Sequence, residues 1–310
     1  MLTMTIRAFQ THILKWHAKH PRPMPWRNTK NPYRIMVSEV MLQQTQVSRV
    51  LPKYKEFLAA FPTLEALKDA PQATLLKAWQ GLGYWRRALR LQQSARQILN
   101  AGKATLAEKT NFKSVGCGRG FVPRPAGGGE QRGETLFKIW FSTPSRLEIL
   151  PGIGHYTARA IACFAFQNQG AFLDTNIRRV YIHFFFAGKQ NVSDKEILPV
   201  AQKAVWKENP REWHYALFDY GAMVLKDKTI NRQSRHYAKQ SAFEGSLRSF
   251  RTRVVNLLLD QPEHRLQKTK LVVWLNAEIQ KQNRPYTADE IIASLLADNL
   301  LKSTPHEYYL

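Results

Sequence analysis

The chain has 310 residues, of which 44% are hydrophobic, a length and composition that suit one large globular domain or two domains. No stretch approaches the ~20 consecutive apolar residues of a membrane-spanning helix. The first twenty residues lack the apolar core and cleavage site of a signal peptide. We therefore expect no membrane partner and a cytoplasmic location.

Charge points to the kind of partner. Lys and Arg number 46 and Asp and Glu 23, which leaves a formal charge of +23 distributed along the whole chain. Such an excess favours a polyanion, most simply nucleic acid. An acidic membrane surface is the weaker alternative, because no concentrated polybasic segment is present. Cys117 and Cys163 form no CxxC pair, so we expect neither a metal site nor a disulfide framework, and a reducing compartment.

In chain order, an amphipathic helix within residues 1–20 leads into a proline-rich connector that contains Trp26 and Arg27. A helix of roughly five turns is predicted from Pro32 to Val50, ended by Pro52. It places Glu39, Gln43 and Gln46 on one face. The spacing alone favours a solvent-exposed Glu39. The alternative is a buried carboxylic acid whose raised pKa suits a general acid.

Further short helices and turns follow. The predicted segments are 53–60, 63–68 and 71–79, then a Gly-bearing turn at 81–84 that opens a helix with Arg86, Arg87 and Arg90 near its start. Residues 103–140 break this pattern, with seven glycines from Gly116 to Gly133. We interpret this stretch as an irregular basic insertion, with a shifted reading frame as the alternative.

Leu150 to Gly154, read LPGIG, is a tight turn before a helix that runs from Tyr156 to Phe166. Its glycines allow the amides of Gly152, Gly154 and His155 to converge at the helix N-terminus, an arrangement that binds phosphate. A helix-hairpin-helix element of this kind holds the DNA backbone without reading sequence. A plain helix–helix turn is the alternative.

Asp174 precedes the next helix, and a capping role for Asp174 or Thr175 would by itself explain an acid there. Helices are also predicted at 196–206 and 213–225, followed by a basic connector at 226–253. The last stretch predicts three helices, at 252–259, 268–281 and 287–297, and a β tail at 300–309. That order fits a small winged-helix module or a short helical bundle.

Three segments together resemble the A/G-specific adenine DNA glycosylases of the helix-hairpin-helix glycosylase superfamily. They are PWRNTKNPYRIMVSEVMLQQTQVSRV, WQGLGYWRRALRL, and LPGIGHYTARAIACFAF with AFLDTNIRRV. The resemblance covers roughly residues 5–225. It implies a mainly α, two-lobed helix-hairpin-helix glycosylase fold with a small C-terminal helical or winged-helix-like module.

The resemblance also assigns roles by position. Glu39 matches the acid that protonates adenine, Asp174 the carboxylate that stabilises the sugar cation, and Tyr156 a residue that supports that chemistry. Tyr156 occupies the position where bifunctional relatives have Lys. Further matches are Gln44 and Tyr84 to residues that wedge into the base stack, Trp26, Arg27 and Leu42 to the adenine pocket with Gln43 beside them, and Asn176 to the residue that orients Asp174. Adenine must be flipped out of the duplex to reach such a site.

Departures from the family are equally specific. No cysteine follows Met223, where most members carry four for an iron–sulfur cluster, so we expect a clusterless branch with no cofactor and no metal. The segment after Leu225 is too short for the usual domain that reads 8-oxoguanine. LDTN replaces LDGN, and Tyr215 stands where a Gln or Glu is frequent.

The sequence thus predicts a glycosylase domain at 1–230 with the insertion at 103–140, a basic linker at 231–250 and a C-terminal module at 251–310. The expected enzyme is a monofunctional, water-using glycosylase that removes adenine opposite G or 8-oxoguanine during base excision repair. Its expected partner is mismatched double-stranded DNA, bound by a monomer at a prokaryotic nucleoid. The alternatives are a glycosylase for another mismatched or damaged base and a non-catalytic DNA-binding relative.

Overall fold

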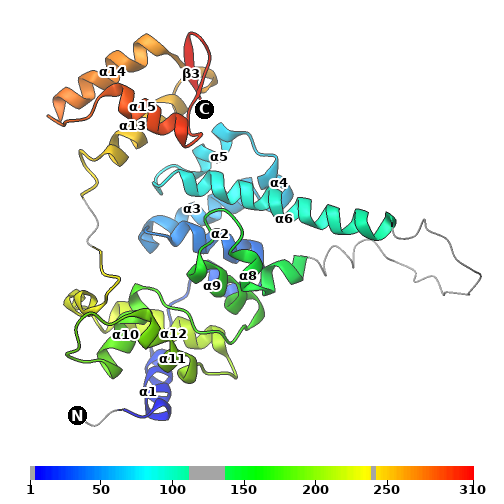
Figure 1. Ribbon diagram of the computed structural model, residues 1–310, viewed down its shortest axis with the longest axis vertical. Coiled ribbons are helices and arrows are strands. Elements are labelled where there is room, and N and C mark those ends of the chain that lie inside the picture. The colour runs from blue at the N-terminus through cyan, green and yellow to red at the C-terminus, as the bar shows by residue number, and fades with distance from the viewer. Residues whose placement is uncertain (1–3, 112–136, 239–241) are drawn as a thin grey trace, which may run out of the picture. The chain divides into compact units, whose positions relative to one another are not determined.

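The structure, a computed structural model, describes residues 4–111, 137–238 and 242–310, and its main elements are helices (Figure 1). The chain divides into two compact units. Unit 1 comprises Met1–Glu39 and Asn100–Lys239, and unit 2 comprises Val40–Leu99 and Gln240–Leu310. The helices α2 (Pro32–Leu42) and α6 (Arg86–Asn111) each contribute residues to both units. Among the described residues, no helix has the length and apolar character that crossing a membrane requires.

Unit 1 holds the chain's first helix and the helices that follow the insertion. In chain order these are α1 (Ile6–Lys19), η1 (Pro25–Asn28), α8 (Pro144–Leu147), α9 (His155–Phe166), α10 (Thr175–Phe185), α11 (Asp194–Ala204), α12 (Pro210–Met223) and η2 (Lys228–Gln233). Phe9 of α1 lies 5.5 Å from the rings of both Tyr181 on α10 and Trp213 on α12, centroid to centroid. These large buried rings hold the three helices together.

Unit 2 joins two parts of the chain. Its elements are the end of α2, α3 (Val47–Ala60), α4 (Leu64–Lys68), α5 (Gln72–Trp79), the start of α6, α13 (Leu247–Leu259), η3 (Pro262–His264), β1 (Arg265–Gln267), α14 (Lys268–Lys281), α15 (Ala288–Ala297), β2 (Lys302–Ser303) and β3 (Glu307–Tyr309). The predicted helices at 53–60, 63–68 and 71–79 are confirmed, with Thr63 as the N-cap of α4.

The single helix predicted from Pro32 to Val50 is wrong. The structure ends α2 at Leu42 and starts α3 at Val47, with Gln44 between them at φ 55. Pro52 lies inside α3 rather than ending a helix. As the sixth residue of α3, it removes one backbone hydrogen bond without ending the helix. Gln43 and Gln46 therefore do not continue the helix face that carries Glu39.

The C-terminal residues form a winged-helix-like arrangement. The strand β1, which follows α13 and η3, pairs with β3, and β3 pairs with β2. The three strands form an antiparallel sheet of order β1-β3-β2. In Figure 1 the helices α13, α14 and α15 gather beside β3. The sheet decides between the two predicted alternatives, because a helical bundle would not contain it. The predicted domain boundaries at 231–250 stay a prediction, although the contacts group residues 240–310 with Val40–Leu99.

The predicted irregular insertion is partly wrong. Residues 103–111 extend α6, and residues 137–140 are also helical. The sequence of the first of these segments, KATLAEKTN, is rich in residues with high helix propensity. The glycine-rich part, residues 112–136, lies outside the described residues.

Candidate active site

Glu39 lies near the end of α2 with only 5% of its surface exposed. Its neighbours in sequence, Val37 and Val40, are also buried. The Tyr156 hydroxyl donates a hydrogen bond to Glu39 Oε2 at 3.1 Å. Burial raises the pKa of Glu39 from 4.5 to about 7, the Asp174 charge raises it further, and the Tyr156 hydrogen bond and the Arg27 charge oppose the shift. At neutral pH a large fraction of Glu39 is therefore protonated and able to give up a proton.

Asp174 is the N-cap of α10, as one of the two sequence-based alternatives predicted. Its carboxylate accepts hydrogen bonds from the Ile177 amide at 2.6 Å and from Asn176 Nδ2 at 3.1 Å. Burial raises the pKa of Asp174, and these two hydrogen bonds and the Arg178 charge oppose that shift. A helix N-terminus also favours the ionised form. Capping and a catalytic role are thus compatible, because the same carboxylate that caps α10 acts electrostatically on Glu39.

The Asn176 backbone packs closely against Gly221 of α12. A Cβ atom on Gly221 of α12 would lie 2.5 Å from the Asn176 backbone oxygen. Only a glycine permits this close approach of the two helices. The amide that orients Asp174 is therefore fixed by packing as well as by its hydrogen bond.

Tyr156 is the second residue of α9 and reaches Glu39 from the hairpin. Its ring packs edge-on against Phe172 at 5.7 Å and Phe218 at 6.5 Å, centroid to centroid. Burial and the neighbouring carboxyls Glu39 and Asp174 raise the pKa of Tyr156 well above its ordinary value. The phenol consequently stays protonated and acts as a hydrogen-bond donor.

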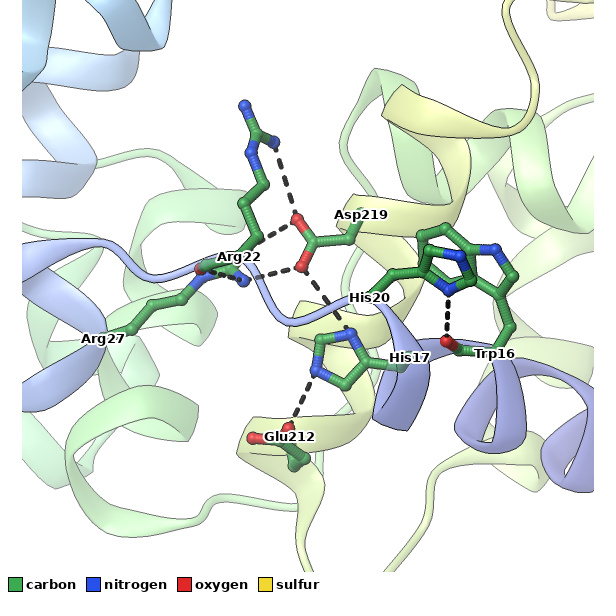
Figure 2. Close-up of polar contacts among 7 residues, drawn as sticks. All are labelled: Trp16, His17, His20, Arg22, Arg27, Glu212 and Asp219. Carbon is green, nitrogen blue, oxygen red and sulfur yellow. Dashed lines mark hydrogen bonds and ion pairs between the residues drawn. The ribbon is translucent and has the colours of Figure 1, made fainter.

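Arg27 follows the buried Trp26 on η1 and is clamped by the fully buried Asp219 of α12. Arg27 Nη1 donates to Asp219 Oδ2 at 2.6 Å and Nη2 to Oδ1 at 2.9 Å. Figure 2 shows Arg22 and His17 directed at the same carboxylate, at 3.5 Å and 3.6 Å. The Arg27 guanidinium also lies 4.4 Å from the centroid of the Tyr215 ring. The cation that opposes the pKa shift of Glu39 is thus held in one orientation.

The predicted phosphate-binding hairpin has the expected form. Gly152 adopts φ 80, and Gly154 is the N-cap of α9, which starts at His155. Gly154 and His155 are exposed. The His155 ring lies 3.0 Å from Glu148 and accepts a hydrogen bond from Arg159 Nε at 2.8 Å. The ring is therefore held by its neighbours, and the backbone amides are the groups suited to a phosphate.

The other predicted site residues lie on two turns of unit 2. Leu42 ends α2, Gln43 and the exposed Gln44 form the turn to α3, and Tyr84 ends the Gly-bearing turn before α6. Gln44 at φ 55 and Tyr84 at φ 48 both adopt the left-handed backbone conformation. Residues other than glycine rarely adopt this backbone conformation without supporting contacts.

Arg87 supplies that support. It is 8% exposed. Its Nη1 donates to the carbonyls of Val40, Met41 and Gln43, at 2.9, 2.8 and 2.6 Å. Its Nη2 donates to Thr45 Oγ1 and to the carbonyls of Leu82 and Gly83, at 3.0, 3.1 and 3.0 Å. One guanidinium therefore caps the end of α2 and joins both turns.

In the sequence, Arg87 is one of several arginines at a predicted helix start, and Asp219 and His17 belong to none of the predicted site motifs. A cation placed near a helix start gives no sign that it will cap another helix. The signal available for Asp219 was an acid within the mostly apolar stretch ALFDYGAM of α12, which predicts a buried partner.

The unit 1 residues can together perform acid-assisted bond cleavage. Glu39 can donate a proton, Asp174 can stabilise a positive charge, and Tyr156 donates a hydrogen bond to Glu39. The described residues include no group of three or more His, Cys, Asp and Glu side chains suited to a metal ion.

Comparisons with known proteins agree with this geometry. The family described as HhH-GPD superfamily base excision DNA repair protein matches residues 37–207. The adenine DNA glycosylase of Buchnera aphidicola is 32% identical over 226 residues, covering 71% of this chain and 54% of that protein. The adenine DNA glycosylase of Mycolicibacterium smegmatis is 30% identical over 316 residues, covering 94% of this chain and 92% of that protein.

Among solved structures, a thermostable thymine-DNA glycosylase matches with a TM-score of 0.55 and 25% identity, covering 72% of this chain and 88% of that one. This chain thus spans about half the length of the Buchnera relative but nearly all of the Mycolicibacterium relative. The sequence motifs, the neighbouring carboxyls Glu39 and Asp174 and these matches agree. The chain belongs to the HhH-GPD superfamily of base excision DNA repair proteins and, within it, to the adenine DNA glycosylase family.

Proposed function

We propose that this protein is a monofunctional DNA glycosylase that removes adenine mispaired with guanine or 8-oxoguanine. The observation that carries the proposal is Glu39, a buried carboxyl with a pKa of about 7 that accepts a hydrogen bond from Tyr156. Neutral adenine is a poor leaving group, so its removal near pH 7 requires an acid that remains protonated there. Most surface Glu side chains are fully ionised at that pH.

The remaining steps follow from the residues around Glu39. As the N-glycosidic bond breaks, the Glu39 proton passes to the base, and the deoxyribose gains positive charge. Asp174, on the same site, stabilises that charge, and water completes the hydrolysis. Tyr156 occupies the position where a Lys would form a covalent adduct with the sugar, and a phenol cannot form that adduct. We therefore infer that the protein does not cut the DNA strand itself.

DNA is the proposed partner. The formal charge of +23 and the exposed Gly154 and His155 at the start of α9 support binding to the phosphate backbone. Adenine within a duplex must be flipped out to reach a buried acid. The left-handed turns at Gln44 and Tyr84 are proposed to enter the base stack as it leaves. Binding is expected to weaken steeply as salt rises, through counterion release.

Three further properties belong to the proposal. Two cysteines in the whole chain cannot supply four ligands, so we infer that no iron–sulfur cluster is present. We infer that the protein acts as a monomer in a prokaryotic cytoplasm, associated with the nucleoid. Zinc and iron analysis of the purified protein and its elution volume on a sizing column test the first two.

A second candidate is excision of another mismatched base. Tyr215 stands where the family frequently has a Gln or Glu, and its ring faces Arg27 at 4.4 Å. The structural match to a thymine-DNA glycosylase favours the same alternative. A purely DNA-binding role would not need the buried Glu39 and the half-buried Asp174 beside a polyanion.

The decisive experiment uses end-labelled duplexes with A:8-oxoG, A:G, T:G and U:G pairs. Each duplex is incubated with the purified protein and then treated with hot alkali, which cleaves at abasic sites. Breaks in the adenine strand of A:G or A:8-oxoG support the proposal, and breaks only in T:G or U:G support the alternative. Breaks without alkali contradict the monofunctional assignment. No breaks in any duplex contradict the enzymatic proposal.

A further inference from the structure

One face of the helix α12 is built around Arg27. Arg211, Tyr215 and Asp219 are spaced four apart on α12 and therefore share a face. Arg211 Nη2 donates to the Arg27 carbonyl at 2.6 Å. The Tyr215 ring centroid lies 4.4 Å from the Arg27 guanidinium carbon, and the Asp219 carboxylate accepts from both Nη atoms. Successive turns of one helix thus hold the backbone, the guanidinium face and the guanidinium end of Arg27.

Asp219 is fully buried, but no step of the proposed hydrolysis uses it. Besides Arg27, the Arg22 guanidinium lies 3.5 Å and the His17 ring 3.6 Å from its carboxylate (Figure 2). The His17 ring also lies 2.8 Å from the half-exposed Glu212, so it is shared between two carboxylates. A buried carboxylate is costly unless it is paired, and Arg27 makes the shortest contact with Asp219, at 2.6 Å. The Asp219 charge is therefore paired mainly with Arg27.

An aromatic cluster joins Arg27 to the surroundings of Glu39. The Tyr215 ring, which faces Arg27, stacks on Phe164 at 4.4 Å, centroid to centroid. Phe164 in turn contacts, at 5.8 and 6.3 Å, the same two rings that pack on Tyr156, the donor to Glu39. Apolar surroundings screen charges far less than water does. The Arg27 charge therefore acts on Glu39 and favours its ionised form.

We propose that Asp219 is a positioning residue of the excision reaction, which offsets the charge of Arg27 so that Glu39 keeps its proton. The inference rests on the proposed function for the reaction that Glu39 serves. An Arg27 without its carboxylate partner would hold Glu39 in the ionised form, which cannot protonate a base. Within the described part of the chain, the groups that act on Glu39 directly are Arg27, Asp174 and Tyr156, so Asp219 acts through Arg27.

The test measures the protonation of Glu39 in the free protein. The full chain is labelled with glutamate that carries ¹³C at the side-chain carboxyl, and the resonance that Glu39→Gln lacks identifies Glu39. We expect the titration midpoint of this resonance to fall by about one pH unit in Asp219→Asn, because the Arg27 charge then loses its partner. Arg27→Met should shift the midpoint in the opposite direction. A purely structural role of Asp219 would predict no such opposition of sign.

The double variant of Arg27→Met and Asp219→Asn tests the route of the effect. If Asp219 acts through Arg27, its replacement should hardly move the Glu39 midpoint once Arg27 is absent. Equal shifts with and without Arg27 would contradict that route. In a protein that excises adenine, the alkaline limb of the single-turnover rate should move with the midpoint in each variant.

Asp298→Asn is the matched control. The Asp298 side chain is 12% exposed and pairs with Arg86 and Arg251 within unit 2. Like Asp219→Asn, this variant removes a carboxylate charge from between two arginines. It should lower the free energy of unfolding and leave the Glu39 midpoint unchanged, which separates lost stability from the proposed electrostatic effect.

Arg22→Met tests the inference where Asp219→Asn does not fold. Its side chain is 35% exposed, more than that of His17 or Arg27, so its removal disturbs the core least. Without Arg22, more of the Asp219 charge offsets Arg27. The midpoint of Glu39 should therefore rise, by less than it does in Arg27→Met.

A Glu39 midpoint that stays constant or rises in Asp219→Asn would overturn the inference, and so would one that stays constant or falls in Arg22→Met. Because the titration needs neither DNA nor excision, a protein that cleaves no duplex can still be tested in this way. Failure of the proposed glycosylase activity and failure of this inference are therefore separate outcomes.

Discussion

Glu39 lies near the end of α2 in unit 1, and the last carbonyls of the same helix contact Arg87 in unit 2. Both side chains are buried, but their charge states at neutral pH differ. Burial raises the pKa of Glu39 to about 7, so part of its population is neutral at physiological pH. Burial lowers the pKa of Arg87 only to about 10, so Arg87 stays charged.

The difference follows from the partners. Around Arg87, six oxygen acceptors replace the water that the guanidinium loses. Around Glu39, the Tyr156 hydroxyl donates a hydrogen bond to the carboxyl, and the nearby Asp174 charge disfavours ionisation. A buried charge with many hydrogen-bond acceptors supports structure, and a buried charge with few hydrogen-bonding partners becomes available for proton transfer.

The largest expected effect is that of Glu39→Gln. It removes the proton donor and keeps the shape, so we expect single-turnover excision to fall by roughly 10³-fold. The variant should still bind a duplex with an abasic-site analogue as the wild type does. Excision that persists unchanged would show that another group protonates the base.

The same variant tests how much the ionised Glu39 carboxylate destabilises the folded protein. Because the native pKa lies above the usual value of 4.5, the native state binds more protons than the unfolded state between those pH values, and stability falls as pH rises through them. Glu39→Gln should therefore be more stable than the wild type at pH 8, by up to about 3 kcal/mol, and nearly equal to it at pH 4. Denaturant unfolding at both pH values measures this difference.

Asp174→Asn separates capping from catalysis. Asn caps helices about as well as Asp, so the free energy of unfolding should change by less than about 1 kcal/mol. The loss of the carboxylate charge should lower excision by on the order of 10²-fold. Asp174→Ala serves as the control that loses both functions. A fully active Asp174→Asn would contradict the role assigned to the charge.

Arg87→Met tests the other side of the comparison. Several carbonyls would lose a charged donor within a buried site, so we expect a destabilisation of ~3 kcal/mol, measured by thermal or denaturant unfolding. Arg90→Met, at an exposed position of α6, is the matched control and should change stability little. Equal stability of the two variants would show that Arg87 does not support the turns.

The smallest expected effect concerns Tyr156. Its hydrogen bond lowers the pKa of Glu39, so Tyr156→Phe should shift the alkaline limb of the pH–rate profile to higher pH. In the wild type, the excision rate should decline as pH rises through about 7, where Glu39 loses its proton. A limb that moves to lower pH in the variant would contradict the direct contact between the two side chains.

Local sequence determined much of the fold. Caps such as Thr63 and the LPGIG turn predicted helix starts correctly, because a cap is satisfied by backbone groups only a few residues away. The motif around Glu39 and the LDTN segment with Asp174 also identified the two carboxyls that the structure places in one site. Their protonation required tertiary structure, because the desolvating groups and Tyr156, which is 117 positions from Glu39, come from distant segments.

The end of α2 at Leu42 and the role of Arg87 were likewise decided by tertiary structure. Local propensity favours a continuous helix through the Gln-rich segment after Leu42, and the distant Arg87 guanidinium stabilises the break by donating to Gln43 and Thr45. The same holds for Asp219, which is 192 positions from Arg27. The sequence by itself therefore indicated the candidate catalytic residues and where most of the helices begin. Only tertiary structure decided which buried charges gain hydrogen-bonding partners, because those partners come from distant segments that the chain brings together on folding.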